Sequence, residues 1–178
     1  EWDGKSKRIT GTISTSGSES NGVGNYGGGY STTVSGTSTT DGEDADGVWS
    51  GHGTGTSNTV TVTGTITTSG TGSSGIEYYG ATNSATISGT INSSGTDSSA
   101  LRNQNGNGNS FQLNEGAIII GDILAIGGST VTNGKLIFNL GEGTSYAYSV
   151  SGNGSGTAAG QWTFSDLDGR TQGISTTG

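Results

Sequence analysis

Hydrophobic residues alternate with small hydroxyl residues along the first hundred positions, in four related segments that begin at Ile9, Val34, Val62 and Ile87. The third segment reads VTGTITTSGTGSSGI. Successive side chains of a strand point to opposite faces, so the alternation predicts strands with Ile and Val on one face and Ser and Thr on the other. Each segment is expected to form one coil of a repeat structure, with an aliphatic ladder inside and a Ser/Thr ladder outside.

Two glycines and one aliphatic residue recur in a fixed frame in every copy. The three sets are Gly11, Gly36, Gly64 and Gly89; then Gly17, Gly42, Gly70 and Gly95; then Val23, Val48, Ile76 and Leu101. The copies start 25, 28 and 25 residues apart, and all the variation falls after the aliphatic residue. A constant part and a variable part predict a coil with two strands and one tolerant loop. The turn glycines are expected to supply the positive φ that a tight reversal needs.

The fold class follows from this repeat and from the complete absence of proline, since interior strands must donate N–H groups to their neighbours. We predict an all-β protein, a parallel β-helix (β-solenoid) of about five or six coils. A β-sandwich is disfavoured because its strands would recur roughly every 8–12 residues with stronger apolar faces.

The second part of the chain carries larger apolar residues. Residues 1–110 are predicted to form the Ser/Thr/Gly-rich repeats, and residues 111–178 a better-packed coil and the C-terminal β region of the same solenoid. The packed coil is expected to use Phe111, Leu113, Ile118, Ile120, Ile123 and Ile126. Longer closing strands are expected to carry Phe138, Tyr146, Tyr148, Trp162 and Phe164. The pattern leaves open whether strands after residue 135 pair in parallel.

Composition narrows the possible partners. Glycine accounts for 37 of 178 residues, charged residues for 11%, and the net charge is −8. An acidic chain lacks the basic face that nucleic acid phosphates require, so no nucleic acid partner is expected. The one cationic cluster, Lys5, Lys7 and Arg8, is expected to be a solvated lead-in. The chain contains no run of about 18 apolar residues, so no membrane span is predicted. It contains no cysteine, so no disulfide can form.

Several short motifs resemble the passenger regions of bacterial autotransporters. They are residues 115–123 (EGAIIIGDI), the Ser/Gly/Thr coils before them, and YAYSVSGNGSG and GQWTFSDLDGR after them. The resemblance implies a right-handed parallel β-helix on the surface of a Gram-negative bacterium or in its surroundings, joined in the parent chain to an outer-membrane β-barrel. Nothing after Arg170 supplies the strands of such a barrel, so a passenger alone is expected. The family has no single activity.

Candidate catalytic residues are few. The single histidine, His52, lies in the variable loop without an acidic partner nearby in sequence, so a solvent-exposed residue is expected there. Serine is too abundant for one nucleophile to stand out, and no nucleophile elbow is present. The protein is therefore predicted not to be an enzyme. A polysaccharide-cleaving β-helix would need paired carboxylates that the sequence does not bring together.

The densest acidic stretch, DGEDADG, contains Asp41, Glu43, Asp44 and Asp46. Calcium prefers several oxygen ligands from one loop, which makes this stretch a candidate calcium site. Its spacing is incomplete for such a loop, so a solvated turn is the alternative. No other cofactor is expected.

Aromatic residues follow the aliphatic position in three copies: Tyr26, Tyr30, Trp49, Tyr78 and Tyr79. The fourth copy has Arg102, Asn103 and Gln104 there instead. Exposed aromatic rings beside amides and hydroxyls could stack on sugar rings, and the alternative is that they cover a thin core.

These observations favour a non-catalytic extracellular structural protein: an adhesin, a stalk or a self-associating fibre subunit. Because the ends of a solenoid expose unpaired strands, a homo-oligomer could form by end-to-end or edge stacking. The outward Ser/Thr ladder gives the alternative of an ice- or carbohydrate-surface-binding β-solenoid, although hydroxyl residues also serve simply to solvate a β face. A polysaccharide-active enzyme is the third hypothesis.

Overall fold

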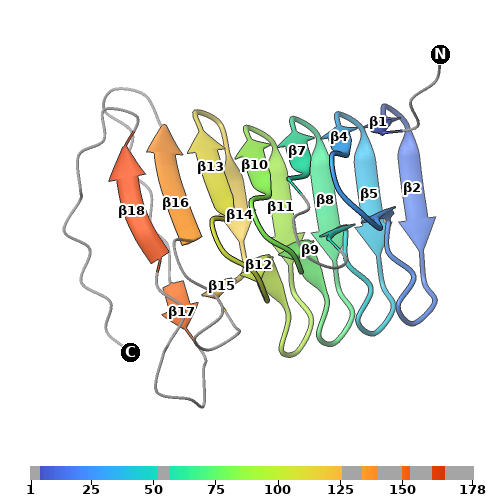
Figure 1. The fold of residues 1–178 in the computed structure, drawn as a ribbon. Coiled ribbons are helices and arrows are strands. Elements are labelled where there is room, and N and C mark those ends of the chain that lie inside the picture. The colour runs from blue at the N-terminus through green and yellow to red at the C-terminus, as the bar shows by residue number, and fades with distance from the viewer. Residues whose placement is uncertain (1–4, 52–56, 126–133, 140–149, 153–161, 167–178) are drawn as a thin grey trace.

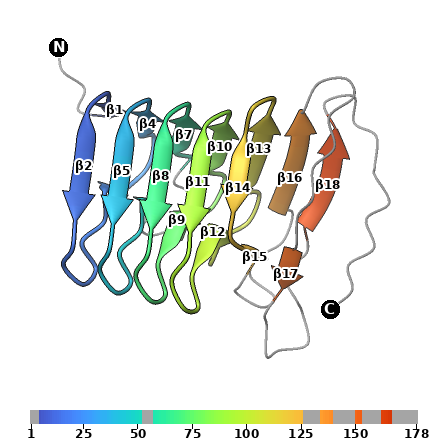
Figure 2. The same ribbon diagram turned by 180° about the vertical axis from the view of Figure 1, so that it is seen from behind.

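The protein is a parallel β-solenoid with three sheets, as the computed structural model shows for residues 5–51, 57–125, 134–139, 150–152 and 162–166. Each of the first five coils contributes one strand to each sheet in turn, and successive coils stack along one axis (Figures 1 and 2). No helix occurs in these ranges, and none of the described residues forms a segment that could cross a membrane as a helix. The predicted all-β parallel β-helix is confirmed.

The strands are short and their bounds repeat from coil to coil. Sheet A consists of β1 (Ser6–Ile9), β4 (Ser31–Val34), β7 (Thr59–Val62), β10 (Ser84–Ile87), β13 (Ser110–Asn114), β16 (Gly134–Asn139) and β18 (Trp162–Asp166). Sheet B consists of β2 (Thr12–Thr15), β5 (Thr37–Thr40), β8 (Thr65–Thr68), β11 (Thr90–Ser93) and β14 (Ile118–Ile120). Sheet C consists of β3 (Val23–Asn25), β6 (Val48–Ser50), β9 (Ser74–Tyr78), β12 (Ser99–Asn103), β15 (Ile123–Ala125) and β17 (Val150–Gly152).

The coil has three strands, so the prediction of two was wrong. The alternating stretch from residue 59 to 68 is divided into β7 and β8 by a corner at Thr63 and Gly64. Side chains keep alternating across the corner, because Val62 and Ile66 both point inward and are fully buried. The alternation therefore could not reveal the bend. The variable part was located correctly, since the extra residues of the second coil fall between β6 and β7.

The predicted aliphatic ladder fills the interior. In sheet A, Ile9, Val34, Val62, Ile87 and Leu113 are aligned by the strand register, and in sheet B the aligned residues are Ile13, Ser38, Ile66, Ile91 and Ile119. Ser38 is the one polar residue of this file, and its buried hydroxyl has no hydrogen-bond partner among the described residues. The buried core cluster extends from Val23 to Leu136, with Ile9, Ile13, Ile119 and Phe138 packed against it.

The two glycine files owe their position to close packing between coils, which corrects the reason predicted for them. None of Gly36, Gly64, Gly42 and Gly70 has a positive φ. A Cβ at Gly64 would lie 2.1 Å from the carbonyl oxygen of Gly36, and one at Gly70 would lie 1.8 Å from that of Gly42. The backbones of successive coils meet at these two corners, and a side chain would separate them.

Polar residues inside the solenoid form ladders of their own. Asn58, Asn83 and Asn109 are buried at the turn from sheet C to sheet A. The side-chain oxygen of Asn83 accepts the N–H of Asn58 at 2.9 Å, and that of Asn109 accepts the N–H of Asn83 at 2.7 Å. Each asparagine thereby satisfies a backbone donor of the preceding coil, which is what allows a tight turn to be buried.

The apolar segment after residue 110 only partly packs as predicted. Phe111, Leu113 and Ile123 are buried, whereas Ile118 and Ile120 are 52% and 51% exposed. The register explains the difference: Ile119 continues the inward file of sheet B, which leaves its two neighbours on the outer face. Ile126, Tyr146 and Tyr148 lie outside the described residues. Phe138 packs against the core, and strands β16, β17 and β18 pair in parallel.

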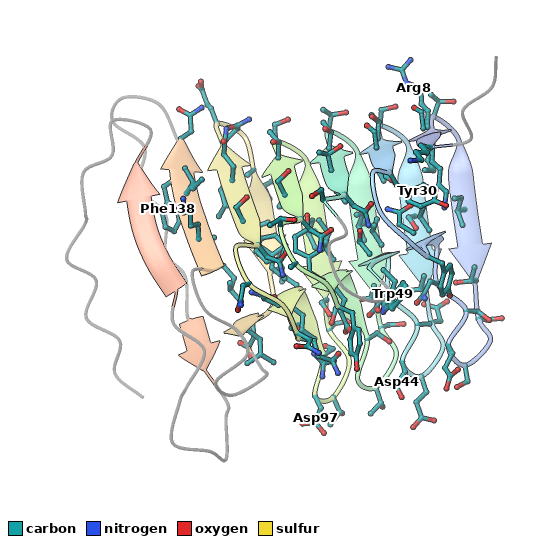
Figure 3. All side chains as sticks on the ribbon, in the orientation of Figure 1. Arg8, Tyr30, Asp44, Trp49, Asp97 and Phe138 are labelled. Carbon is teal, nitrogen blue, oxygen red and sulfur yellow. The ribbon has the colours of Figure 1, made fainter. Side chains whose placement is uncertain are left out.

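The first coil places Lys7 at an interior position, which corrects the expectation of a solvated lead-in for that residue, whereas Lys5 and Arg8 are exposed. Lys7 aligns with the buried Thr32 and Val60, and its ammonium donates to the carbonyl oxygen of Gly24. It also lies 5.0 Å from the ring centre of Tyr30. Burial lowers the pKa of Lys7. Tyr30 and Arg8 lie together toward the first strands, and Phe138 lies toward the far end of the solenoid (Figure 3).

Candidate functional site: a groove on sheet C

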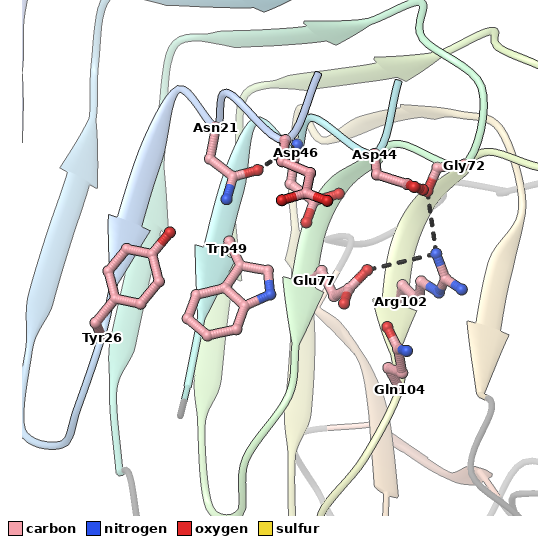
Figure 4. A pocket seen from close by; sticks show the side chains of 10 residues that line it. Asn21, Tyr26, Asp44, Asp46, Trp49, Gly72, Glu77, Arg102 and Gln104 are labelled. Atoms are coloured by element: carbon pink, nitrogen blue, oxygen red, sulfur yellow. Dashed lines mark hydrogen bonds and ion pairs between the residues drawn. The ribbon is translucent and has the colours of Figure 1, made fainter. Parts of the chain in front are cut away.

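The outer face of sheet C carries the most chemically varied surface of the described residues. Gly24, Trp49, Glu77 and Arg102 occupy one outward column, each in register with the next. Turns from sheet B form one rim, and the residues that follow the sheet C strands form the other. Between them lies a groove of about 390 Å³, here called the sheet C groove (Figure 4). Its lining residues are Glu19, Asn21, Tyr26, Asp44, Asp46, Trp49, Gly72, Glu77, Arg102 and Gln104.

Three of the predicted aromatic residues form a continuous row beside this groove. The ring centres of Tyr26 and Trp49 are 4.8 Å apart, and those of Trp49 and Tyr79 are 6.3 Å apart with nearly parallel planes. Tyr26 and Tyr79 are 64% and 41% exposed, so the row faces solvent. Such a row offers flat apolar surface to a flat ligand.

The other two predicted aromatic residues do not belong to this surface. Tyr78 alternates with Tyr79, so it points inward and is fully buried, with its ring stacked on Phe111 at 4.8 Å. Burial raises the pKa of Tyr78 well above its usual value. Tyr30 is half-buried, and its backbone N–H donates to Asn58 Oδ1 at 2.8 Å. Period-two alternation decides which tyrosine of the Tyr78–Tyr79 pair can reach a ligand.

The floor of the groove is charged. Arg102 Nη1 lies 3.4 Å from Glu77 Oε2 and donates to the carbonyl oxygen of Gly72 at 3.1 Å. Burial raises the pKa of Glu77, against the opposing effects of Arg102 and a hydrogen bond from Ser74. Asp46 is only 4% exposed, and its Oδ1 accepts the backbone N–H of Ser74 at 2.6 Å. Burial and the nearby Glu77 raise the pKa of Asp46 to about 8.

The four acidic residues of the candidate calcium stretch lie in different local environments. Asp41 Oδ1 accepts the hydroxyl of Ser69, Asp44 has a positive φ at the tip of the turn, and Asp46 points into the groove. Glu43 is exposed, and its carbonyl oxygen accepts the backbone N–H of Glu19. Across the described residues, no three His, Cys, Asp or Glu side chains are grouped so that they could hold a metal ion. His52 lies outside these residues.

Glu77 was not singled out by sequence reasoning, although its position in the repeat was visible. It follows the aliphatic residue Ile76, as Trp49 follows Val48 and Arg102 follows Leu101. Alignment of the four copies thus already places these side chains in one column, and parallel in-register pairing turns the column into a surface. Asp46 could not be found in this way, because its inward turn depends on the shape of the loop.

The predicted Ser/Thr ladder forms a second regular surface on sheet B. Its outward residues are Thr12, Ser14, Thr37, Thr39, Thr65, Thr67, Thr90 and Asn92, in register across four strands. This face has hydroxyl groups but neither aromatic nor charged side chains on the four strands, so it differs from sheet C.

Comparison of the chain with known protein families, curated proteins and solved structures finds no match.

Proposed function

We propose that this solenoid is a non-catalytic adhesin that binds carbohydrate chains in the sheet C groove. The observation that carries the proposal is the row of Tyr26, Trp49 and Tyr79, of which Tyr26 and Trp49 line the polar sheet C groove. Aromatic faces bind the apolar faces of sugar rings, while carboxylates and amides such as Glu77 and Gln104 can accept or donate to ring hydroxyls. Ligand sites commonly combine these two kinds of group.

The row also matches the form of a polymer. It crosses three coils, and neighbouring coils of a parallel sheet are about 4.8 Å apart, so its length suits several consecutive residues of a glycan rather than one. A solenoid provides a rigid support for such an extended site. An extracellular or cell-surface location, in the passenger of a Gram-negative autotransporter, is part of this proposal and rests on the motif resemblance alone.

Retention on insoluble polysaccharides tests the proposal. The chain should sediment with at least one of cellulose, chitin, chitosan or bacterial peptidoglycan, and Trp49→Ala should lose most of that retention. Thr39→Ala, an outward substitution on sheet B, is the matched control and should bind as the wild type does. Circular dichroism and urea midpoints must show that both variants stay folded. Failure of the wild type to sediment with any of these polymers would overturn the proposal.

The non-catalytic part of the proposal has its own readout. Incubation with the retaining polysaccharide should release no new reducing ends or unsaturated products. Release that disappears in Asp46→Asn or Glu77→Gln would show instead that the groove carboxylates act as an acid and base pair.

A second candidate function is binding to ice or another crystalline surface through sheet B. The in-register Thr and Ser positions of four strands supply a two-dimensional hydroxyl array, with a spacing of about 4.8 Å across strands and about 6.6 Å along them. Measurement of thermal hysteresis separates this function from the first. Hysteresis that Thr67→Lys abolishes and Trp49→Ala leaves intact would favour sheet B, and its absence in the wild type removes this candidate.

A further inference from the structure

The sheet C groove has more negative than positive charge, and its one positive charge is already engaged. Four carboxylates line it, those of Glu19, Asp44, Asp46 and Glu77, against the single guanidinium of Arg102. Arg102 is paired with Glu77 and bonded to a backbone carbonyl. Among the described residues, no basic side chain lies within ion-pair distance of the other three carboxylates. The groove is therefore complementary to a cation.

Asp46 is the carboxylate whose surroundings most clearly lack a partner. The Asp46 side chain lines the groove and is 4% exposed (Figure 4). One of its oxygens accepts the backbone N–H of Ser74, and no described donor contacts the other oxygen. A buried carboxylate without a full set of donors is unfavourable, and such a group takes up a proton instead. The raised pKa of Asp46, about 8, agrees with this geometry.

The aromatic row and the carboxylates are close enough for one ligand to contact both. Trp49 and Glu77 are register partners on adjacent strands, about 4.8 Å apart, and Asp46 precedes Trp49 by three residues on the same coil. A sugar ring on Trp49 would thus carry its substituents over the acidic floor.

We propose that the groove binds amino sugars with a free, protonated amine: the ring stacks on Trp49 and the ammonium donates to Asp46, with Asp44 and Glu77 adding attraction. The inference rests on the proposed carbohydrate binding and specifies the substrate class. A metal ion fits the same charges less well, because no three carboxylates converge on one point among the described residues. Uronic acids would be repelled. Neutral sugars would keep the aromatic contacts and the bonds to ring hydroxyls but would lack the charge-assisted bond to Asp46.

Titration calorimetry at pH 6 with three tetrasaccharides of similar shape tests the inference. They are the glucosamine tetramer, which is cationic, and the N-acetylglucosamine tetramer and cellotetraose, which are neutral. The glucosamine tetramer should bind severalfold more tightly than either neutral one, because the charge-assisted hydrogen bond and the attraction of Asp44 and Glu77 together exceed the work of removing the proton from Asp46. Asp46→Asn should remove the preference but keep the weaker neutral binding, and Trp49→Ala should weaken binding of all three.

The number of protons released on binding is a second readout, and the overall charge of the protein would not change it. At pH 6 the free Asp46 is protonated, so binding of an ammonium should expel a proton, and calorimetry in two buffers of different ionisation enthalpy should detect release of up to about one proton per site. Asp46→Asn should abolish this release. Asp97→Asn, an exposed turn carboxylate in the fourth coil, is the control that removes one charge without touching the groove.

The outcomes separate the two proposals. Equal binding of charged and neutral tetramers would overturn the amino-sugar inference while leaving carbohydrate binding intact. A preference that survives Asp46→Asn, or falls equally in Asp97→Asn, would also overturn it, because the cause would then be the overall charge of −8. No binding of any tetramer, together with no retention on polysaccharides, would overturn both proposals.

Discussion

Replacement of Asp46 by asparagine should change how the stability of the solenoid depends on pH. The pKa of Asp46 is raised from 3.8 to about 8, chiefly by burial, so the folded state holds a proton that the unfolded state releases. A group with a raised folded pKa stabilises the fold fully below its unfolded pKa, and this stability is lost as pH rises toward the folded pKa. For Asp46 the affected range is pH 4 to 8, and the raised pKa of Glu77 acts in the same direction.

The size of the effect follows from the linkage relation. Each pH unit between the two pKa values corresponds to about 1.4 kcal/mol, so the wild type should lose about 2 to 3 kcal/mol of unfolding free energy between pH 5 and pH 7 through Asp46. Asp46→Asn keeps an oxygen that accepts the N–H of Ser74 but has no proton to lose. The unfolding free energy of Asp46→Asn minus that of the wild type should therefore increase by about 2 to 3 kcal/mol from pH 5 to pH 7.

Urea unfolding followed by circular dichroism at pH 5, 6 and 7 provides the measurement, with constant m-values as the check on two-state behaviour. Asp97→Asn makes the same chemical change on the exposed side of a turn, where asparagine tolerates the positive φ, and its curve should follow that of the wild type. If the Asp46→Asn and wild-type free energies instead ran parallel over this pH range, Asp46 would not be held protonated and the argument from burial would be refuted.

Three further predictions concern the stacking of coils. Gly64→Ala should lower the urea midpoint sharply, by about 3 kcal/mol or more in unfolding free energy, because the coils would have to separate, whereas Gly11→Ala has open space and should be neutral in the monomer. If copies of the chain associate end to end through the first coil, Gly11→Ala should lower the mass measured by light scattering at high concentration; an unchanged mass would place any association elsewhere. Ser38→Ile should raise the unfolding free energy by about 1 to 3 kcal/mol, because it removes a buried hydroxyl without a described partner. The larger side chain has room beside Gly22, as the Ile66 side chain has beside Gly47. A loss of stability would refute this prediction.

Most of the fold could be predicted because the repeated residues lie in the strands themselves. The spacing of Val34, Val62 and Ile87 already contained the register, and the outer column of Trp49, Glu77 and Arg102 follows from that register. The third strand of the coil was missed since alternation continues across the corner at Gly64. The function of the glycine files was also misjudged, because a sequence shows that a side chain is missing but not which backbone would meet it.

The groove needed the structure for a different reason. Tyr78 and Tyr79 are equivalent by composition, and only the phase of β9 turns one into the core and leaves the other in the row. Asp46 is one of four acidic residues in its stretch, and the turn conformation alone decides that it is buried against Ser74. Alternation from the inward Ile76 determines the burial of Tyr78. Loop geometry is not encoded in a periodic pattern, so local contacts determine the burial of Asp46.

Mapping of the bound ligand by NMR shows directly whether the outer face of sheet C is the binding surface. A soluble oligosaccharide fragment of the retaining polysaccharide is titrated into isotope-labelled protein, and amide and indole N–H shifts are followed. The largest shifts are expected on Trp49, Glu77, Arg102 and Gln104. Shifts confined to the threonines of sheet B, or scattered along the solenoid without saturation, would contradict this expectation.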